Sequence, residues 1–290
     1  MRIAVFDDDR VGLVEGDQIF DVTSAVPAGP AWPPVFMNRL IREWDQRQAQ
    51  VLTARATATP RALADVALRA PVPAPLQIAA APTNYARHIE EMGALGSGVS
   101  MRKLGFFIKA PASITGPGGP VILPKGSARQ FHHECELAVV IGRTCRDVPA
   151  ADALAYIFGY TCLMDITMRV TPASKEERVM RKSFDTFTPI GPWIVTADEI
   201  PDPQDLSMTL QVNGELRQQA TTRDMIVSVV EQIALVSSVM TLQPGDIIAT
   251  GTPAGVGPIT PGDVVRIDIE RVGAFEVDVQ EAESYAPVRF

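Results

Sequence analysis

The sequence has few cysteines, no long apolar run and no excess of positive charge, and each absence excludes a class of protein. Its three cysteines, among 290 residues, form no CxxC pair and are too few for a disulfide framework, which indicates reduced thiols in the cytoplasm. Lys and Arg number 26 against 34 Asp and Glu, a net charge of −8, which argues against a nucleic-acid partner because binding phosphates requires clustered cations. No apolar run approaches the roughly 18–20 residues of a membrane span, so we expect no membrane partner.

The N-terminus also lacks the pattern of a secretory signal. The opening stretch MRIAVFDDDR carries three consecutive aspartates where a signal peptide would need its apolar segment. We therefore expect a cytoplasmic protein.

The composition itself is that of an ordinary globular protein, with 46% hydrophobic and 21% charged residues. A chain of this length forms one large domain or two of unequal size, and it needs no structural metal to fold. Four prolines within residues 70–82 favour an extended connector. We predict a small N-terminal domain at residues 1–75 and a larger domain at residues 76–290.

In the N-terminal domain, the sequence predicts a hairpin followed by helix. The two strands of the hairpin are expected at Arg2–Phe6 and Gln18–Val22, because turn residues lie between them. The segment 35–70 is rich in Ala and Arg and is expected to be helical.

In the larger domain, short strands predominate. Helices are expected at Pro149–Phe158, closed by Gly159, and at Thr222–Met240, where apolar residues recur at helical spacing. Strand-rich stretches separated by single helices, without regular βαβ alternation, predict an α+β fold that is predominantly β, and not a Rossmann fold or a TIM barrel. The expected strands are Pro120–Leu123, Glu134–Ile141, Gly191–Val195, Ser207–Val212, Asp246–Thr250, Asp263–Ile269 and Phe275–Val279.

Two carboxylates enter one of these strands together. Glu134 and Glu136 are two residues apart, so they project from the same side of an extended chain. They would repel each other beside an apolar strand unless a cation lies between them, and Mg²⁺, Mn²⁺ and Ca²⁺ all prefer carboxylate oxygen. A strand end with two solvated acids is an equally good interpretation of this segment alone.

A zinc site is a weaker interpretation of the same segment. His132, His133 and Cys135 are adjacent in sequence, but neighbouring strand residues face opposite sides. His132 therefore shares a face with Glu134 and Glu136, whereas His133 and Cys135 lie on the other face.

Three further segments contain candidate functional residues. Asp165, amid apolar neighbours, is either a third oxygen ligand or the partner of Arg169 within a helical turn. The Gly/Thr turn at 250–255 follows a buried strand, where backbone can approach a ligand closely. His88 and Glu91, three residues apart, form either a water-activating pair on one helical turn or ordinary charges on a surface helix.

Taken in order, these segments resemble the fumarylacetoacetate hydrolase family over roughly residues 76–280. The run at 170–172, Val-Thr-Pro, departs from the acid and glutamine that many relatives have after the DxTxR motif. The motifs that carry the resemblance are NYxxHxxE at 84–91, HECELAVVIG at 133–142, DxTxR at 165–169, KSFDTFTPIGPW at 182–193, VNGELRQ at 212–218 and LQPGDIIATGTPAGVG at 242–257.

The resemblance implies a mixed β-roll catalytic domain, assembled as a homodimer, that holds Mg²⁺ or Mn²⁺, with Ca²⁺ as an alternative. It implies that Lys182 adds positive charge near the metal. It also implies that His88 and Glu91 orient or activate water from a lid, and that Arg169 and Thr252 contact substrate. The metal ligands implied are Glu134, Glu136 and Asp165.

The resemblance also implies a reaction. We expect a divalent-metal-dependent hydrolase that cleaves a C–C bond of a small anionic acylpyruvate-like (2,4-dioxo acid) substrate through a metal-chelated enolate, in the catabolism of aromatic compounds or sugar acids. Alternatives within the family are a 2-hydroxyhepta-2,4-diene-1,7-dioate isomerase or 5-oxopent-3-ene-1,2,5-tricarboxylate decarboxylase, and an oxaloacetate decarboxylase. An alternative of another class is a non-catalytic small-molecule binding protein on the same fold.

Overall fold

The structure is a computed structural model that describes residues 1–26, 35–94, 99–174 and 176–284. None of the helices in these ranges is long and apolar enough to cross a membrane. The α-helices are α1 (Phe36–Arg42), α2 (Trp44–Thr57), α3 (Ala86–Ala94), α4 (Met101–Leu104), α5 (Arg178–Lys182) and α6 (Val229–Val239). Short 3₁₀ helices are η1 (Thr23–Ala25), η2 (Leu63–Asp65), η3 (Pro111–Ser113), η4 (Ala150–Tyr156), η5 (Ala197–Glu199) and η6 (Thr222–Asp224).

The strands of the described residues form three sheets. The largest has 12 strands, and its continuous path is β4-β3-β2-β1-β14-β12-β11-β17-β6-β7, with β5 on β1 and β8 on β14. Its strands are β1 (Arg2–Phe6), β2 (Arg10–Glu15), β3 (Gln18–Asp21), β4 (Arg61–Ala62), β5 (Leu68–Arg69), β6 (Ile78–Ala80), β7 (Phe107–Lys109), β8 (Ile114–Thr115), β11 (Cys135–Ile141), β12 (Ile157–Met164), β14 (Thr188–Thr196) and β17 (Ile247–Ala249).

The other two sheets complete the larger domain. A five-stranded sheet has the order β16-β15-β19-β20-β9, and a three-stranded sheet has the order β13-β10-β18. Their strands are β9 (Val121–Leu123), β10 (Phe131–His133), β13 (Thr167–Met168), β15 (Ser207–Val212), β16 (Glu215–Thr221), β18 (Gly257–Ile259), β19 (Val264–Ile269) and β20 (Gly273–Glu281).

The main core lies between the large sheet and the five-stranded sheet. Leu137 and Val139 of β11 belong to the same buried cluster as Leu210 of β15 and Ile267 of β19. The alternate residues of β11, such as Val140, join a second cluster with the apolar side of α1. Strand β11 is therefore buried on both faces, which places a rigid strand at the centre of the fold.

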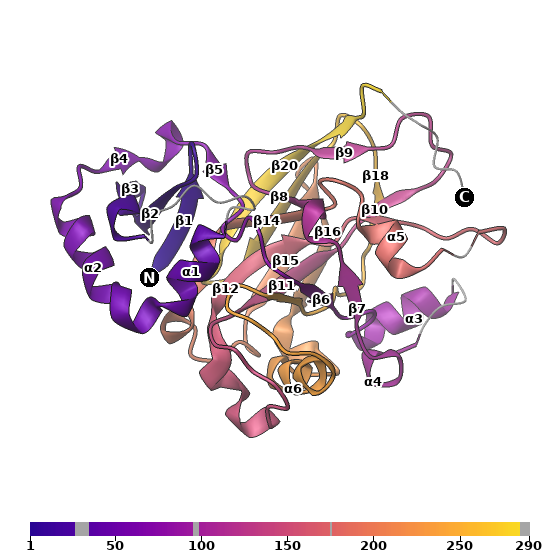
Figure 1. Ribbon diagram of the computed structural model, residues 1–290. Coiled ribbons are helices and arrows are strands. Elements are labelled where there is room, and N and C mark those ends of the chain that lie inside the picture. The colour runs from indigo at the N-terminus through magenta and orange to yellow at the C-terminus, as the bar shows by residue number, and fades with distance from the viewer. Residues whose placement is uncertain (27–34, 95–98, 175, 285–290) are drawn as a thin grey trace.

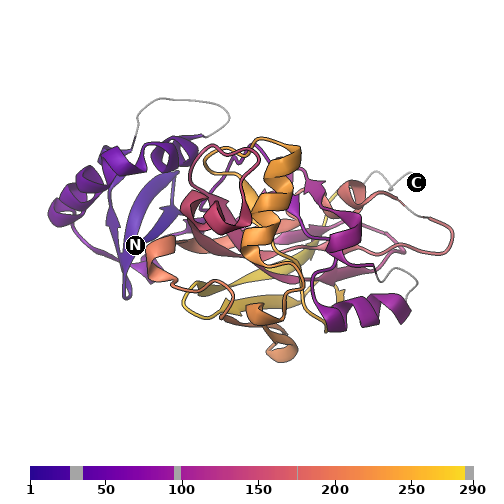
Figure 2. The ribbon, with the colours of Figure 1, turned by 90° about the horizontal axis from the view of Figure 1, so that it is seen from below.

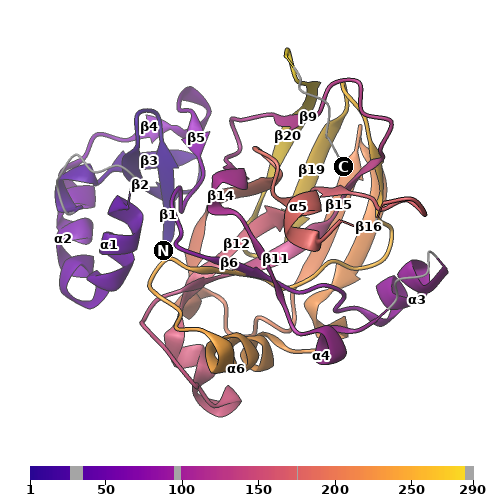
Figure 3. The ribbon, with the colours of Figure 1, turned by 45° about the vertical axis from the view of Figure 1, so that its right-hand side comes forward.

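The N-terminal unit lies on the left in Figure 1 and Figure 3. The β-roll of the larger domain, which includes the five-stranded sheet, lies beside it. Helices α3 and α4 lie at the end of the roll away from the N-terminal unit, and α6 packs along its lower side (Figure 1 and Figure 2). Strand β1 pairs with β14 antiparallel, with Arg2 opposite Val195, so the large sheet continues into the N-terminal unit. The division at residue 75 stays a prediction.

The predicted predominantly β, α+β fold is confirmed, but two N-terminal details were wrong. The expected hairpin has a further strand, β2, inserted between β1 and β3. The expected helix over 35–70 ends at Thr57, because the chain then turns back to pair β4 with β3 and β5 with β1.

Both helices expected in the larger domain are shorter than predicted. The first is the 3₁₀ helix η4, and Gly159 lies inside β12, where a Cβ atom would come within 2.2 Å of the Val195 carbonyl oxygen. The second begins only at Val229. Ser228 caps this helix: its hydroxyl accepts a hydrogen bond from Glu231 N, and its backbone N donates one to the Glu231 side chain. Residues upstream of Ser228 are held instead by Asn84, which accepts from Val227 N and donates to Val227 O.

Candidate metal centre and active site

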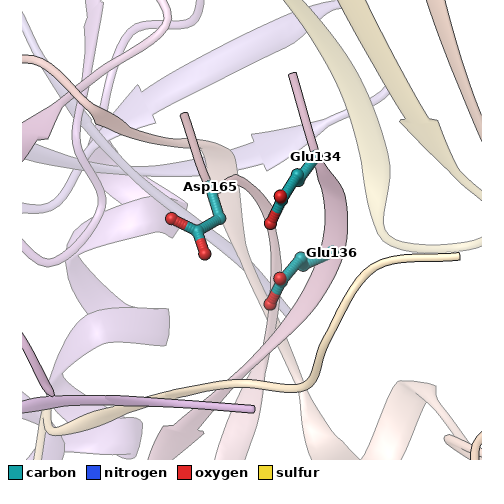
Figure 4. Close-up of side chains that lie close together, drawn as sticks. All are labelled: Glu134, Glu136 and Asp165. Carbon is teal, nitrogen blue, oxygen red and sulfur yellow. The ribbon is translucent and has the colours of Figure 1, made fainter. Parts of the chain in front are cut away.

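Three carboxylates lie close together at the start of β11 and the end of β12. Glu134 lies between β10 and β11, Glu136 lies within β11, and Asp165 follows β12 directly. The antiparallel ladder sets Cys135 opposite Met164, and Asp165 N donates to Glu134 O over 2.9 Å. One carboxylate oxygen from each residue lies within 4.8 Å of the others, and all three side chains are buried (Figure 4). Two solvated acids at a strand end are thereby excluded.

Three cations balance this negative charge. Lys182 of α5 donates to Glu134 Oε2 over 2.8 Å and also bonds Asp165 Oδ2. Arg169 Nη2 donates to Glu134 Oε1 over 2.8 Å. Burial alone would raise the pKa of Glu134, but Lys182 and Arg169 hold it below its usual range. Arg169 therefore pairs with Glu134 and not with Asp165, and the residues between them form β13 instead of a helical turn.

The third cation, Lys109 of β7, was missed by the sequence analysis. It is fully buried and donates to Asp165 Oδ1 over 2.5 Å and to the carbonyl oxygens of Lys182 and Phe187. Burial lowers its pKa, which Asp165 opposes. A lysine within the apolar run FFIKA was the available signal, since a charge there must be paired to be buried.

Glu136 is the carboxylate that the protein leaves uncompensated. Its Oε2 accepts a 2.8 Å hydrogen bond from Gly251 N, whereas its buried Oε1 has no partner within the described part of the chain. Burial, and then the charges of Asp165 and Glu134, raise the pKa of Glu136 well above its usual value. A buried, unpaired carboxylate oxygen beside two other carboxylates fits a hard divalent cation.

The turn after β17 brings its backbone up to Glu136, as expected for a Gly/Thr turn at this position. Gly251 has φ +97, and a Cβ atom there would lie 2.7 Å from Asn84 Cβ. Only glycine gives both that conformation and that close approach. Thr252, the next residue, is buried and accepts a hydrogen bond from Gln218 Nε2 over 2.8 Å.

His88 and Glu91 contact each other on α3. His88 Nδ1 lies 2.9 Å from Glu91 Oε2, and Glu91 Oε1 accepts from Gly255 N over 3.2 Å. Burial would raise the pKa of Glu91, but the hydrogen bonds from His88 and Gly255 lower it. The His88 side chain is only 2% exposed, so the pair is not an ordinary surface helix start.

The two faces of the HHECE segment separate as the alternation predicts. His133 Nδ1 and Cys135 N both bond Gln218 Oε1, on the side away from the carboxylates. Among the described residues, the one group of acids, histidines and cysteines placed to hold an ion is Glu134, Glu136 and Asp165. The zinc interpretation therefore has no support here.

The comparisons with known proteins agree with this site. Across residues 77–280 the sequence matches the family described as fumarylacetoacetate (FAA) hydrolase C-terminal. The chain belongs to the fumarylacetoacetate hydrolase family. It is 43% identical to maleylpyruvate hydrolase from Aquipseudomonas alcaligenes over 290 residues, covering 97% of this chain and 99% of that protein.

Solved structures of the fumarylacetoacetate hydrolase family resemble the whole chain. Maleylpyruvate hydrolase from Sphingobium sp. SYK-6, in complex with manganese(II) ion and pyruvate, is 46% identical, with a TM-score of 0.87 over 98% of this chain and 100% of that one. A 2-hydroxyhepta-2,4-diene-1,7-dioate isomerase from Mycobacterium marinum is 34% identical, with a TM-score of 0.73 over 98% and 100%. The predictions of a family enzyme, of a metal-dependent C–C hydrolase and of a divalent cofactor such as Mn²⁺ are confirmed.

Proposed function

We propose that this protein hydrolyses maleylpyruvate, a 2,4-dioxo acid, to maleate and pyruvate. The observation that carries the proposal is the buried His88–Glu91 pair, in which His88 Nδ1 lies 2.9 Å from Glu91 Oε2. Likeness to maleylpyruvate hydrolases over nearly the whole chain supports the choice of substrate. The role assigned to each residue below is part of the proposal.

Glu134, Glu136 and Asp165 would hold the divalent cation. When bound, that cation would supply a Lewis acid for the 2-oxo acid end of the substrate and would stabilise the negative charge that bond cleavage leaves there. Lys182 adds a fixed positive charge on the side of Glu134 and Asp165. Arg169 and Thr252 bind the substrate and orient it.

His88 is the base in this scheme. Glu91 accepts from Nδ1 and thereby leaves Nε2 able to take a proton from water. The hydroxyl adds to the acyl carbonyl carbon, and the bond between this carbon and the pyruvyl methylene carbon breaks. The electron pair of that bond remains on the pyruvyl carbon, which takes up a proton to give pyruvate, while the acyl group leaves as maleate.

A product assay with Mn²⁺ tests the proposal across maleylpyruvate, acetylpyruvate, fumarylpyruvate and oxaloacetate. Pyruvate and maleate in equal amounts from maleylpyruvate are the expected result. Release of CO₂ from oxaloacetate alone would instead identify a decarboxylase. No reaction with any of the four substrates would contradict hydrolysis and leave an isomerase or a binding protein.

A second candidate is an isomerase of 2-hydroxyhepta-2,4-diene-1,7-dioate. It is favoured by a solved structure of that name that is 34% identical over nearly the whole chain. An isomerase needs a proton shuttle but no attacking water. A change in the absorbance of the diene without release of pyruvate would identify this activity.

We also propose that two chains form a homodimer. Three apolar side chains are exposed close to one another: Val170 by 40%, Val179 by 42% and Met180 by 45%. Val170 follows β13, and the other two lie on α5, which packs against β13. Apolar side chains gathered in this way are typical of an interaction surface. Light scattering should give twice the chain mass of 31.3 kDa, and the mass of one chain would contradict the proposal.

Cytoplasmic localisation is a further part of the proposal. Cys135, Cys145 and Cys162 are free and buried, as expected in a reducing compartment. Fractionation of the source cells with an antibody to the protein tests this location.

A further inference from the structure

His132 is the one member of the HHECE segment to which the site described above gives no role. It lies in β10, two residues before Glu134, and therefore on the same side of the chain as the carboxylates. The imidazole is not part of the carboxylate group that could hold an ion. Strand pairing sets it opposite Thr167, which lies between Asp165 and Arg169 in the sequence.

Strand pairing brings Arg169 and His132 together. In the ladder between β10 and β13, Phe131 pairs with Met168 and His132 with Thr167. The ladder continues with a 2.9 Å hydrogen bond from Arg169 N to Gln130 O, so Arg169 lies opposite Gln130. Residues on one face of an antiparallel pair reach their diagonal neighbours, so the side chains of Arg169 and His132 share that face.

Both side chains keep an unused nitrogen atom. His132 Nδ1 and Arg169 Nε are each buried, and no residue that the structure describes forms a hydrogen bond with either nitrogen. Arg169 Nη2 is already occupied by Glu134, so its Nε–H is left for something else. Buried polar groups are nearly always paired, and two unpaired nitrogens on one face beside an active site therefore point to a ligand.

The chemistry of the two nitrogens defines the ligand group. The guanidinium Nε–H can only donate, and His132 Nδ1 donates when Nε2 is the unprotonated nitrogen. His132 Nε2 lies 3.4 Å from Gln130 Oε1. A half turn of the amide exchanges its oxygen and nitrogen, and Gln130 Nε2 then donates to the unprotonated ring Nε2. Two neighbouring donors, one of them cationic, match the two oxygens of a carboxylate.

We propose that His132 Nδ1 and Arg169 Nε bind the carboxylate at the acyl end of the substrate, so that the site selects acylpyruvates with two carboxylates over those with one. The inference rests on the proposed hydrolase function. Lys182 contacts Glu134 Oε2 and Asp165, whereas Arg169 contacts Glu134 Oε1. The 2-oxo acid end of the substrate would lie on the Lys182 side and the acyl end on the side of Arg169 and His132.

The test compares kcat/KM for maleylpyruvate, which has two carboxylates, with that for acetylpyruvate, which has one. His132→Ala should lower the value for maleylpyruvate about 10- to 100-fold, the worth of a hydrogen bond to a charged group, and leave that for acetylpyruvate within about threefold. His132→Asn keeps a donor near the position of Nδ1 and should restore most of the loss. Equal losses with both substrates, or no rescue by asparagine, would overturn the inference.

Ligand binding separates this inference from the function on which it rests. Maleate and pyruvate are titrated by calorimetry into the Mn²⁺-loaded wild-type protein and into His132→Ala. The expected result is at least about tenfold weaker maleate binding with pyruvate and Mn²⁺ binding unchanged. If the wild type hydrolyses neither substrate, the proposed function fails, but this result would still support the carboxylate subsite. Unchanged maleate binding would overturn the subsite, whatever the activity.

Discussion

Gln218 Nε2 donates a 2.8 Å hydrogen bond to Thr252 Oγ1, and the amide oxygen of the same side chain binds the segment that contains Glu134. Gln218 Oε1 accepts from Cys135 N over 3.0 Å and from His133 Nδ1 over 3.1 Å, on either side of Glu134 in the sequence. One buried side chain thus links the segment around a candidate metal ligand to the turn that contains Thr252.

Gln218→Glu should disturb this connection with almost no change in shape. The carboxylate keeps the acceptors for His133 and Cys135 but has no donor for Thr252. We expect the free energy of unfolding to fall by about 1–3 kcal/mol, the cost of an unsatisfied buried group, and KM to rise. Urea denaturation and steady-state kinetics measure both effects. Gln219→Glu, at the exposed neighbouring position, is the matched control and should change neither.

Lys109→Met should destabilise the metal-free protein more than the metal-loaded one. Lys109 is fully buried, and its removal leaves the charge of Asp165 without one of its partners. Breaking a buried ion pair in this way costs about 3–5 kcal/mol. Mn²⁺ should restore part of this loss, because a ligand that binds only the folded state stabilises it. Denaturation with and without Mn²⁺ measures the difference, and Lys103→Met, on the exposed side of α4, is the control.

Glu136→Gln should remove metal binding while the fold stays intact. Glutamine keeps an acceptor for Gly251 N, and the ionised form of Glu136 is already disfavoured by burial and by Asp165 and Glu134. The stability of the metal-free protein should therefore be unchanged or higher. Affinity for Mn²⁺ should fall by more than the roughly 100-fold that loss of an outer partner causes. Calorimetric affinity equal to that of the control Glu276→Gln, on the exposed side of β20, would refute the assignment.

Glu91→Gln and His88→Gln should separate chemistry from metal binding. If His88 is the base, turnover should fall about 10²- to 10⁴-fold in His88→Gln, the range for loss of a general base. Mn²⁺ affinity should stay within a few-fold of wild type in both variants. Glu90→Gln changes the exposed neighbour of Glu91 and should keep full activity. A parallel loss of turnover and metal affinity would instead assign the pair a structural role.

Local sequence patterns and the family resemblance pointed to the carboxylates and to Lys182, but neither indicated Lys109. The same-side projection of Glu134 and Glu136 follows from strand alternation, which needs no knowledge of the fold. Lys109 could not be found in this way, because its contact with Asp165 depends on how β7, α5 and the end of β12 meet. Strand β12 was missed because its first residues, Ile157 and Phe158, were assigned to the helix expected at Pro149–Phe158 and Gly159 to the end of that helix.

Asp246 and Asp263 occupy equivalent positions in two turns of similar sequence. Because they differ in burial, we expect a change of pH to affect the stability of the protein in opposite directions through the two residues. Each ends an xPGD sequence and accepts from the backbone N three residues earlier, at Gln243 and at Thr260. Burial raises the pKa of Asp246 to about 6. Burial would also raise the pKa of Asp263, which is partly exposed, but its hydrogen bonds with Thr260 and Asn213 hold it below its usual value.

The sign of each effect follows from which state binds more protons. Between pH 3.8 and about 6 the folded protein keeps the Asp246 proton that the unfolded chain has lost, so stability falls as the pH rises through this window, by up to about 3 kcal/mol. For Asp263, stability is instead lost as the pH falls below 3.8. Denaturation of Asp246→Asn at pH 4 and pH 7 should therefore show a gain relative to wild type at the higher pH. The Asp263→Asn variant should show no such gain, and a pH-independent difference for Asp246→Asn would mean that this carboxylate is ionised without cost.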